Sequence, residues 1–281
     1  MKVLNSIGRQ AIRHVPYSRS LFRACELYCR RFETAGSEDN GDMTSNGELR
    51  LLKEVGNSIK VAFDVGANKG EWTANLLSVA PGVTCIHAFE PFRQSYDALS
   101  SRSFPKLVSL HRFGLSSRSG KAEIFSFEGR SALNSLHNRS GLENGWDIHP
   151  SSTTYEVDLQ TIDEFRAEHG IAEVDFLKID TEGHEVAVLE GAKSTLRENA
   201  VKIAQFEYGG AYIDSRTLLK DVFELVAPYN YKIFLINPNG LTAYPRYDQR
   251  LENFHYKNFV MFRQDALGLS RSAEDACRRL S

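Results

Sequence analysis

Short apolar runs and longer amphipathic segments alternate along the chain from residue 59 onward. Runs rich in Val, Ile and Phe predict strands, and apolar residues at helical spacing predict helices of about 10–15 residues between them. The predicted strands cover 59–66, 83–91, 107–116, 121–129, 174–180, 201–209, 231–237 and 257–263, and 153–170 predicts a strand that continues into a helix. The other predicted helices include 70–80, 92–102, 184–199 and 215–228. This alternation predicts an α/β fold with a doubly wound, mainly parallel sheet. The last strands follow one another without a long helix, which predicts an antiparallel edge.

Composition divides the chain into three parts. Residues 34–47 are polar and rich in Gly and Ser, which is typical of a linker. We therefore expect an N-terminal extension with its linker over 1–47, one α/β domain over 48–264, and a C-terminal tail over 265–281.

The N-terminal extension is basic. Residues 1–33 contain seven Lys or Arg and two Glu, a net charge of +5. The whole chain has a net charge of −2, so the remaining residues are at −7. An Arg-rich, acid-poor leader is typical of an organelle transit segment or of a helix on a membrane surface. Our preferred interpretation is a helical arm, with weak contact to a membrane surface as the alternative.

Composition also narrows the class of protein. A hydrophobic content of 42% and a charged content of 25% are typical of a soluble globular protein. No apolar run approaches the roughly 20 residues of a membrane span. The acidic remainder of the chain argues against a nucleic-acid partner, because it repels phosphates. The four cysteines form neither a CxxC pair nor a disulfide-dense pattern, which predicts a reducing compartment and a cytoplasmic protein.

The first candidate site is a glycine turn after the first predicted strand, in "VAFDVGANKGEW" over 61–72. Asp64 ends the strand, and Gly66 and Gly70 bracket a turn that opens a helix. Glycines allow a ligand to approach the backbone, and the helix N-terminus supplies free N–H groups. Asn68 tolerates left-handed geometry in the middle of the turn. The spacing DxGxNxG differs from the GxGxxG of dinucleotide sites and suits a ligand with a cationic amino-acid group.

The second candidate site lies at the end of the next predicted strand, in "HAFEP". Glu90 follows Gly70 by 20 residues, a position from which a carboxylate accepts hydrogen bonds from both ribose hydroxyls of a nucleoside cofactor. Pro91 ends the strand, and Phe92 offers an apolar face for a base. A solvated carboxylate at a strand end is the plain alternative for Glu90 alone. The spacing of the two motifs together favours a nucleoside ligand.

The third candidate site is "FLKIDTEGHEVAVLEG" over 176–191, where an apolar strand runs into titratable residues. Asp180, Glu182 and His184 are candidate general bases, and so is Glu207 at the end of a later strand. Each residue also has a structural interpretation. Asp180 suits the cap of a helix, and the charge of Glu182 favours a helix N-terminus. His184 suits the first turn of a helix, and Glu207 suits an ion pair with Arg or Lys.

A metal site made of Asp180, Glu182 and His184 is an alternative, because these side chains share a face of an extended backbone. We expect the helix to begin before His184, which breaks that alternation. The sequence therefore assigns no metal.

Several motifs together resemble the FkbM family of S-adenosylmethionine-dependent methyltransferases. They are "FDVGANKGEWT", "HAFEP", "FLKIDTEGHEVAVLEGA", "IAQFEYG" and "KNFVMFR", and the similarity covers about residues 59 to 263. The "KIDTEGHE" block is the most specific of them. The resemblance implies a class I methyltransferase fold, S-adenosylmethionine as methyl donor, and O-methylation of sugars or secondary metabolites. It also implies that Asp64, Gly66, Ala67, Asn68 and Gly70 hold the methionine end of the cofactor, that Glu90 holds the ribose, and that Pro91 and Phe92 lie beside the adenine.

The resulting hypothesis is an O-methyltransferase that acts on a hydroxyl of a carbohydrate or another small metabolite. Two irregular segments, 129–153 and 237–256, are expected to shape the acceptor pocket, and Arg246 and Arg250 suit a sugar or an anionic substrate. An NAD-dependent dehydrogenase is the enzymatic alternative, which DxGxNxG disfavours. A non-catalytic nucleoside-binding scaffold is the alternative from another class. The oligomeric state and the identity of the acceptor stay open.

Overall fold

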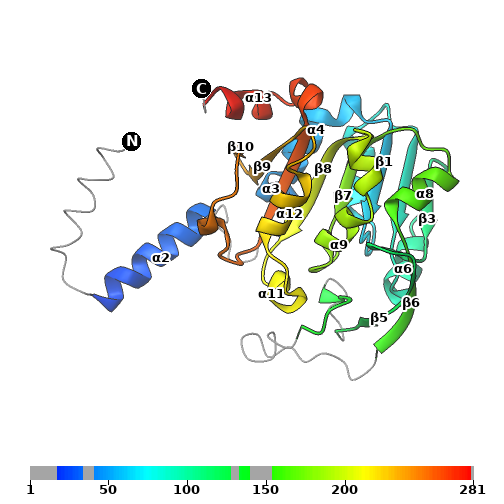
Figure 1. Ribbon diagram of the computed structural model, residues 1–281, viewed down its shortest axis with the longest axis horizontal. Helices are drawn as coiled ribbons and strands as arrows, with labels where there is room; N and C mark the ends of the chain where they lie inside the picture. The colour runs from blue at the N-terminus through cyan, green and yellow to red at the C-terminus, as the bar shows by residue number, and fades with distance from the viewer. Residues whose placement is uncertain (1–17, 34–40, 128–132, 140–153, 280–281) are drawn as a thin grey trace. The chain divides into compact units, whose positions relative to one another are not determined.

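The computed structural model describes residues 18–33, 41–127, 133–139 and 154–279 (Figure 1). The chain divides into two compact units, Met1–Asn40 and Gly41–Ser281. The described part of the first unit is the helix α2 (Arg19–Glu33), in which Leu21, Phe22, Leu27 and Tyr28 are exposed. Among the residues that the structure describes, none of the helices has the length and apolarity needed to span a bilayer.

An eight-stranded sheet forms the centre of the second unit, with the strand order β10-β9-β11-β8-β7-β1-β2-β3. The strands are β1 (Val61–Val65), β2 (Cys85–Phe89), β3 (Val108–His111), β7 (Val174–Ile179), β8 (Val201–Tyr208), β9 (Tyr231–Asn237), β10 (Gly240–Tyr244) and β11 (Lys257–Arg263). The five strands from β3 to β8 are parallel, and β11 pairs antiparallel with both β8 and β9. The predicted doubly wound, mainly parallel sheet and its antiparallel edge are therefore confirmed.

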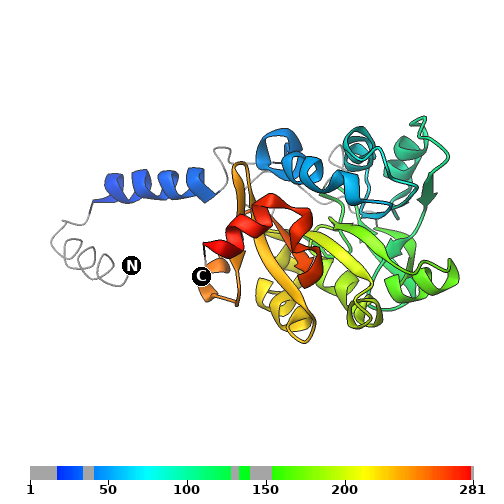
Figure 2. The same cartoon turned by 90° about the horizontal axis from the view of Figure 1, so that it is seen from above.

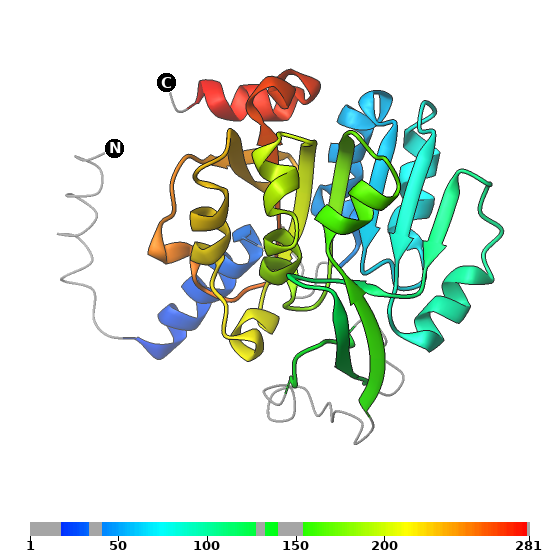
Figure 3. The ribbon, with the colours of Figure 1, turned by 45° about the vertical axis from the view of Figure 1, so that its right-hand side comes forward.

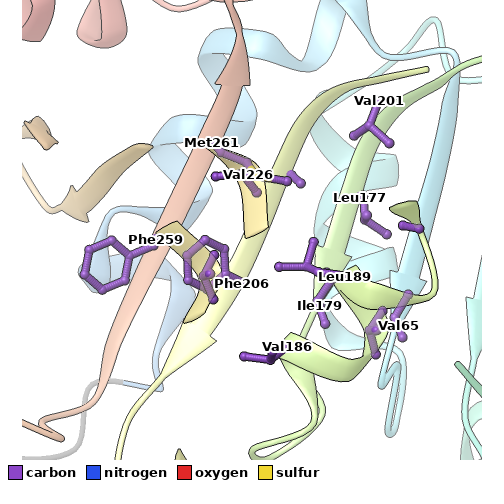
Figure 4. Packing of buried hydrophobic residues seen from close by; sticks show 14 of the residues in the cluster. Val65, Leu177, Ile179, Val186, Leu189, Val201, Phe206, Val226, Phe259 and Met261 are labelled. Carbon is purple, nitrogen blue, oxygen red and sulfur yellow. The ribbon is translucent and has the colours of Figure 1, made fainter. Parts of the chain in front are cut away.

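Helices cover both faces of this sheet, as the view from above shows (Figure 2). One face carries α4 (Glu48–Val55), α5 (Glu71–Val79), α6 (Arg93–Ser100) and α13 (Arg271–Arg278). The other face carries α8 (Ile162–Glu168), α9 (Glu185–Glu190), α10 (Lys193–Arg197) and α12 (Leu219–Val226). Because side chains alternate along a strand, β7 sends Leu177 and Ile179 toward the second face and Phe176 toward the first. Figure 4 shows Leu177, Ile179 and Phe206 in the core with Val186 and Leu189 of α9.

A second, three-stranded sheet of order β4-β6-β5 was not predicted (Figure 3). It consists of β4 (Gly114–Leu115), β5 (Gly120–Phe125) and β6 (Thr154–Gln160). The single strand expected over 107–116 is therefore wrong, since it divides into β3 of the main sheet and β4 of the small one. Gly114 lies beside Leu159 of β6, and a Cβ there would be 2.9 Å from the Leu159 side chain. The pairing with β6 takes the chain out of the main sheet at this point.

The helix expected over 184–199 is also divided, into α9 and α10. A Cβ on Gly191 would lie 2.0 Å from the backbone oxygen of Ser116, so the chain passes too closely for another residue at this position. The shorter elements are α3 (Met43–Asn46), α11 (Ala211–Ser215), η1 (Gly56–Ser58), η3 (Gln249–Leu251) and η4 (Gln264–Leu269). Besides η4, two elements of the second unit lie outside the expected 48–264. They are α3, inside the expected linker, and α13, in the expected tail, where Ala273 and Ala276 are buried.

Candidate active site

The turn after β1 has the tight geometry that its glycines predicted. Gly66, Asn68 and Gly70 have φ angles of 82°, 46° and 77°, in the left-handed region. A Cβ on Gly66 would lie 1.8 Å from the backbone oxygen of Asp180, and a Cβ on Gly70 would lie 2.6 Å from the Leu99 side chain. The turn therefore requires glycine at both positions, and it lies directly against the end of β7.

Glu90 at the end of β2 is held beside this turn by two backbone N–H groups. Asn68 N donates to Oε2 and Phe92 N donates to Oε1, each at 2.8 Å. The side chain is 6% exposed, and this burial raises its pKa to about 7 despite the two donors. Each carboxylate oxygen retains a second lone pair for a ligand. The arrangement fits a ligand that offers two adjacent hydroxyl groups, such as a ribose.

The other residues expected to bind the cofactor differ in their packing and hydrogen bonds. Asp64 is 1% exposed and accepts a hydrogen bond from Thr73 Oγ1 at 2.6 Å, which links the end of β1 to α5. Burial raises the pKa of Asp64 to about 6. Ala67 is buried against α6, and Pro91 lies next to Glu90. Phe92 differs from the expectation, because its ring is 4% exposed and packs edge-on against Tyr155 of the small sheet.

Three of the four candidate bases meet at the ends of β7 and β8. Asp180, Glu182 and Glu207 each bring a carboxylate oxygen within 4.8 Å of the other two. Asp180 directly follows β7, and Glu207 lies near the end of β8, because the carboxyl ends of parallel strands share one edge of the sheet. Glu182 has a φ angle of 53°, which turns the chain sharply between β7 and α9.

Two cations that the sequence reasoning missed are paired with this cluster. Lys178 Nζ donates to Asp180 Oδ2 at 2.8 Å, and the Arg139 guanidinium donates to Glu182 Oε2. The signal for Lys178 was a charge inside a central apolar strand. Arg139 lies in a segment with no helical or strand pattern, so the sequence contained no signal for its pairing.

The cations decide which of the three carboxylates is ionised. The ammonium of Lys178 holds the pKa of Asp180 below its usual range, against the effect of burial. Burial raises the pKa of Glu182 to about 8, although Arg139 opposes the shift. Burial and the charge of Asp180 raise the pKa of Glu207 well above its usual range. Of the three carboxyl groups, Asp180 is therefore the one whose pKa favours ionisation, whereas burial favours the protonated forms of Glu182 and Glu207.

The fourth candidate, His184, lies behind this cluster rather than in it. Its Nε2 is 2.9 Å from Ser116 Oγ, and its Nδ1 is 3.1 Å from His137 Nε2. Burial first and then His137 lower the pKa of His184 to about 4, so the ring is neutral. The expectation that a helix begins before His184 is wrong, because α9 begins at Glu185. The missed residues Ser116 and His137 come from distant segments of the chain.

The three metal ligands that the sequence suggested, Asp180, Glu182 and His184, do not lie together in the structure. Both ring nitrogens of His184 have partners within the protein, and Glu207 lies with Asp180 and Glu182 in its place. The three carboxylates are close enough to share a cation, yet Lys178 and Arg139 already supply positive charge there. We assign no metal to this cluster.

Glu185 has a structural role at the start of α9. Its carboxylate accepts hydrogen bonds from the backbone N–H groups of Thr181 at 2.8 Å and Gly183 at 3.0 Å. The side chain is fully buried, and burial raises its pKa to about 7. These bonds fix the backbone of the turn that carries Glu182.

The two segments expected to shape the acceptor pocket are partly described. In the first, Ser135 Oγ donates to the Glu182 backbone oxygen at 2.7 Å, so residues 133–139 lie against the carboxylate cluster. Most of 129–153, including Trp146, lies outside the described residues. In the second, 237–256, the chain forms β10 and η3, and Arg250 pairs with Asp248.

The chain is similar to known methyltransferases. A family model described as the methyltransferase FkbM domain matches residues 64–233. The hexuronic acid methyltransferase AglP of Haloferax volcanii is 30% identical over 177 residues, which are 62% of this chain and 66% of that protein, just under two thirds of its length. The solved structure of methyltransferase FkbM from Methylobacillus flagellatus KT is 19% identical, with coverage of 73% of this chain and 43% of that one and a TM-score of 0.44. SMU.1697c, a putative methyltransferase from Streptococcus mutans solved in complex with SAH, is 11% identical, with coverage of 76% and 94% and a TM-score of 0.41.

Proposed function

We propose, since the chain belongs to the FkbM family of methyltransferases, that it is an S-adenosylmethionine-dependent O-methyltransferase acting on a hydroxyl group of a carbohydrate. The observation that carries this proposal is the position of Glu90. Its buried carboxylate lies beside a left-handed glycine turn, and that turn contacts the strand end bearing Asp180. A cofactor site and an acceptor site therefore adjoin each other.

The cofactor, when bound, supplies an electrophilic methyl group on a sulfonium ion. Glu90 accepts hydrogen bonds from the ribose hydroxyls, because each of its oxygens has a lone pair beyond the one used by Asn68 or Phe92. The turn over 66–70 approaches the methionine end with its backbone, and Asp64 links the end of β1 to α5. Ala67 and Pro91 complete the wall of this site.

Asp180 receives the proton of the acceptor hydroxyl. Methyl transfer makes the acceptor oxygen strongly acidic as the new C–O bond forms, so a carboxylate with a lowered pKa is a sufficient base. Its side chain is 36% exposed, the most accessible of the three carboxylates, which suits contact with a substrate. Glu182 and Glu207, whose carboxyl groups lie beside that of Asp180, hydrogen-bond other oxygens of the sugar and orient it.

The carbohydrate class is supported by the relative whose printed name is hexuronic acid methyltransferase. The alternatives differ from this proposal in measurable ways. A dehydrogenase would bind NAD, and a scaffold would bind the nucleoside without transferring a methyl group.

The test uses calorimetry and a labelled methyl donor with the full chain. We expect S-adenosylmethionine and S-adenosylhomocysteine to bind and NAD not to bind. Label from S-adenosyl-[methyl-¹⁴C]methionine should then pass to glucuronic acid, galacturonic acid or their methyl glycosides, with glucose as the uncharged comparison. Tight NAD binding without a response to S-adenosylhomocysteine would overturn the cofactor assignment. Binding of S-adenosylmethionine without label on any sugar would overturn the acceptor class.

A further inference from the structure

Lys178 is a buried cation in the middle of the main sheet. It is 3% exposed and lies on β7, with Asp64 of β1 and Gln205 of β8 as its neighbours in the sheet register. The alternation of side chains places it on the same face as Phe176, the face that α4 covers. A lysine is rarely buried to this extent unless it is paired, so its neighbours must account for it.

Four carboxylates interact with this ammonium group. Asp180 follows on the same strand and accepts its hydrogen bond at 2.8 Å. Glu207 of β8 and Glu48 of α4 interact with it electrostatically, and so does Asp64 of β1.

Glu48 is held mainly by amide side chains rather than by Lys178. Glu48 is 3% exposed, and its carboxylate accepts hydrogen bonds from Asn46, Gln205 and Asn258. Glu48 thus has neutral amide partners of its own. Asp180 is the carboxylate that the Lys178 ammonium contacts directly.

The number of acidic groups exceeds the number of cations here. Asp64, Asp180, Glu182 and Glu207 interact with one another, and their cations are Lys178 and Arg139. Carboxylates this close cannot all ionise, and an ammonium group favours the ionised form of the carboxylate that it contacts. Arg139 faces Glu182, and Lys178 faces Asp180.

We propose that Lys178 is a positioning residue for methyl transfer, whose buried ammonium group keeps the Asp180 carboxylate ionised and directed at the acceptor hydroxyl. The inference rests on the proposed function of this site. The side chain of Lys178 is 4% exposed and that of Asp180 is 36% exposed, so the ammonium lies behind the carboxylate as seen from solvent. Lys178 therefore acts through Asp180 and does not contact the acceptor.

The test is an NMR titration of the full chain labelled with ¹³C at the aspartate carboxyl carbon, which needs neither cofactor nor acceptor. The Asp180 signal is assigned by its loss in Asp180→Asn. In the wild-type chain it should titrate below the ordinary range of an aspartate. In Lys178→Met its midpoint should rise by about one to three pH units, and Lys178→Arg should keep it low. Lys178→Gln replaces the Met variant if that variant precipitates.

Lys202→Met is the matched control, because Lys202 pairs with Glu173 and Asp175 at the opposite end of the sheet. It should leave the Asp180 titration unchanged. With a sugar that accepts label, Lys178→Met should lower kcat about 5-fold or more at a pH about one unit below its new Asp180 midpoint, where most of its Asp180 is protonated. The loss should shrink as the pH rises through the new midpoint, with little change in KM.

Two outcomes overturn the inference. One is an Asp180 midpoint that is the same in Lys178→Met as in the wild type. The other is a kcat loss in Lys178→Met that is the same at every pH. Failure of the proposed function is a separate result, since it appears as a wild-type chain that does not bind S-adenosylhomocysteine.

Discussion

Gly66 and Asp180 lie in such close contact that a side chain on the glycine would overlap the aspartate backbone. A Cβ built on Gly66 is 1.8 Å from the Asp180 oxygen, and Asp180 N donates to the Val65 oxygen at 2.9 Å. The turn proposed to hold the cofactor and the strand end proposed to receive the acceptor are therefore one packed unit. A change in either is expected to disturb both.

Gly66→Ala should destabilise the protein and abolish binding of S-adenosylhomocysteine. The new methyl group collides with backbone that has no room to move, and the φ angle of 82° is unfavourable for alanine. We expect a loss of about 3 kcal/mol or more in the free energy of unfolding, measured by urea denaturation. Gly210→Ala is the control, because nothing lies within 4 Å of a Cβ there. Equal stability of the two variants would contradict the contact.

Glu90→Gln should weaken S-adenosylhomocysteine binding by about 1–3 kcal/mol in calorimetry. The amide loses the charge and presents an NH₂ group to one of the two backbone N–H donors that hold Glu90. Glu123→Gln changes an exposed residue of β5 and should leave the affinity unchanged. Unchanged affinity in Glu90→Gln would remove Glu90 from the cofactor site.

The ligand-free protein should lose stability as the pH rises from about 6.5 to 8. Folding raises the pKa of Glu90 and Glu185 to about 7 and that of Glu182 to about 8, so the folded state binds more protons than the unfolded state in this range. The lowered pKa values of His184, His87 and His111 act in the opposite direction, mostly below the ordinary value of 6.5.

Differential scanning calorimetry should therefore show a melting temperature that falls by about 5 °C or more over this range. Glu182→Gln should flatten the upper part of the curve. A melting temperature that rises with pH would show that these carboxyl groups are ionised in the folded protein.

Asp180→Asn should lower turnover by about 100-fold or more while S-adenosylhomocysteine affinity changes little. His184→Ala should have a smaller effect, because both of its ring nitrogens face Ser116 and His137. Asp175→Asn, near the opposite end of the same strand, is the control. Full turnover per folded molecule in Asp180→Asn would show that the cluster is a structural junction. The same result would give no support for Glu182 or Glu207 as the base.

Deletion of residues 1–40 should leave the affinity for S-adenosylhomocysteine unchanged, because the second compact unit begins at Gly41. Deletion of residues 1–58 should instead give insoluble protein. It removes α4, whose Leu51, Leu52 and Val55 are buried, and with it the Glu48 partner of Gln205 and Asn258. Loss of binding in the shorter deletion would place the N-terminal extension in the site.

The sequence by itself determined seven strands of the main sheet, but not β10, and the positions of Asp64, Glu90, Asp180 and Glu207 at its strand ends. Each of these signals is local, since an apolar run ends in a polar residue and parallel strands end at the same edge. The small sheet was missed because β4 and β6 are paired across about 45 positions of the chain, as in Gly114 with Leu159. The pattern of apolar and polar residues within β4 or β6 does not indicate which strand each one pairs with.

The tertiary structure alone decided which charges meet. Arg139 comes from an irregular segment and reaches Glu182, and Ser116 and His137 enclose His184 from two other parts of the chain. Lys178 lies within a strand that the sequence predicts. Its electrostatic effect, however, depends on carboxylates from the neighbouring strands and α4. Ionisation in a buried site depends on distances between side chains, and those distances exist only once the chain has folded.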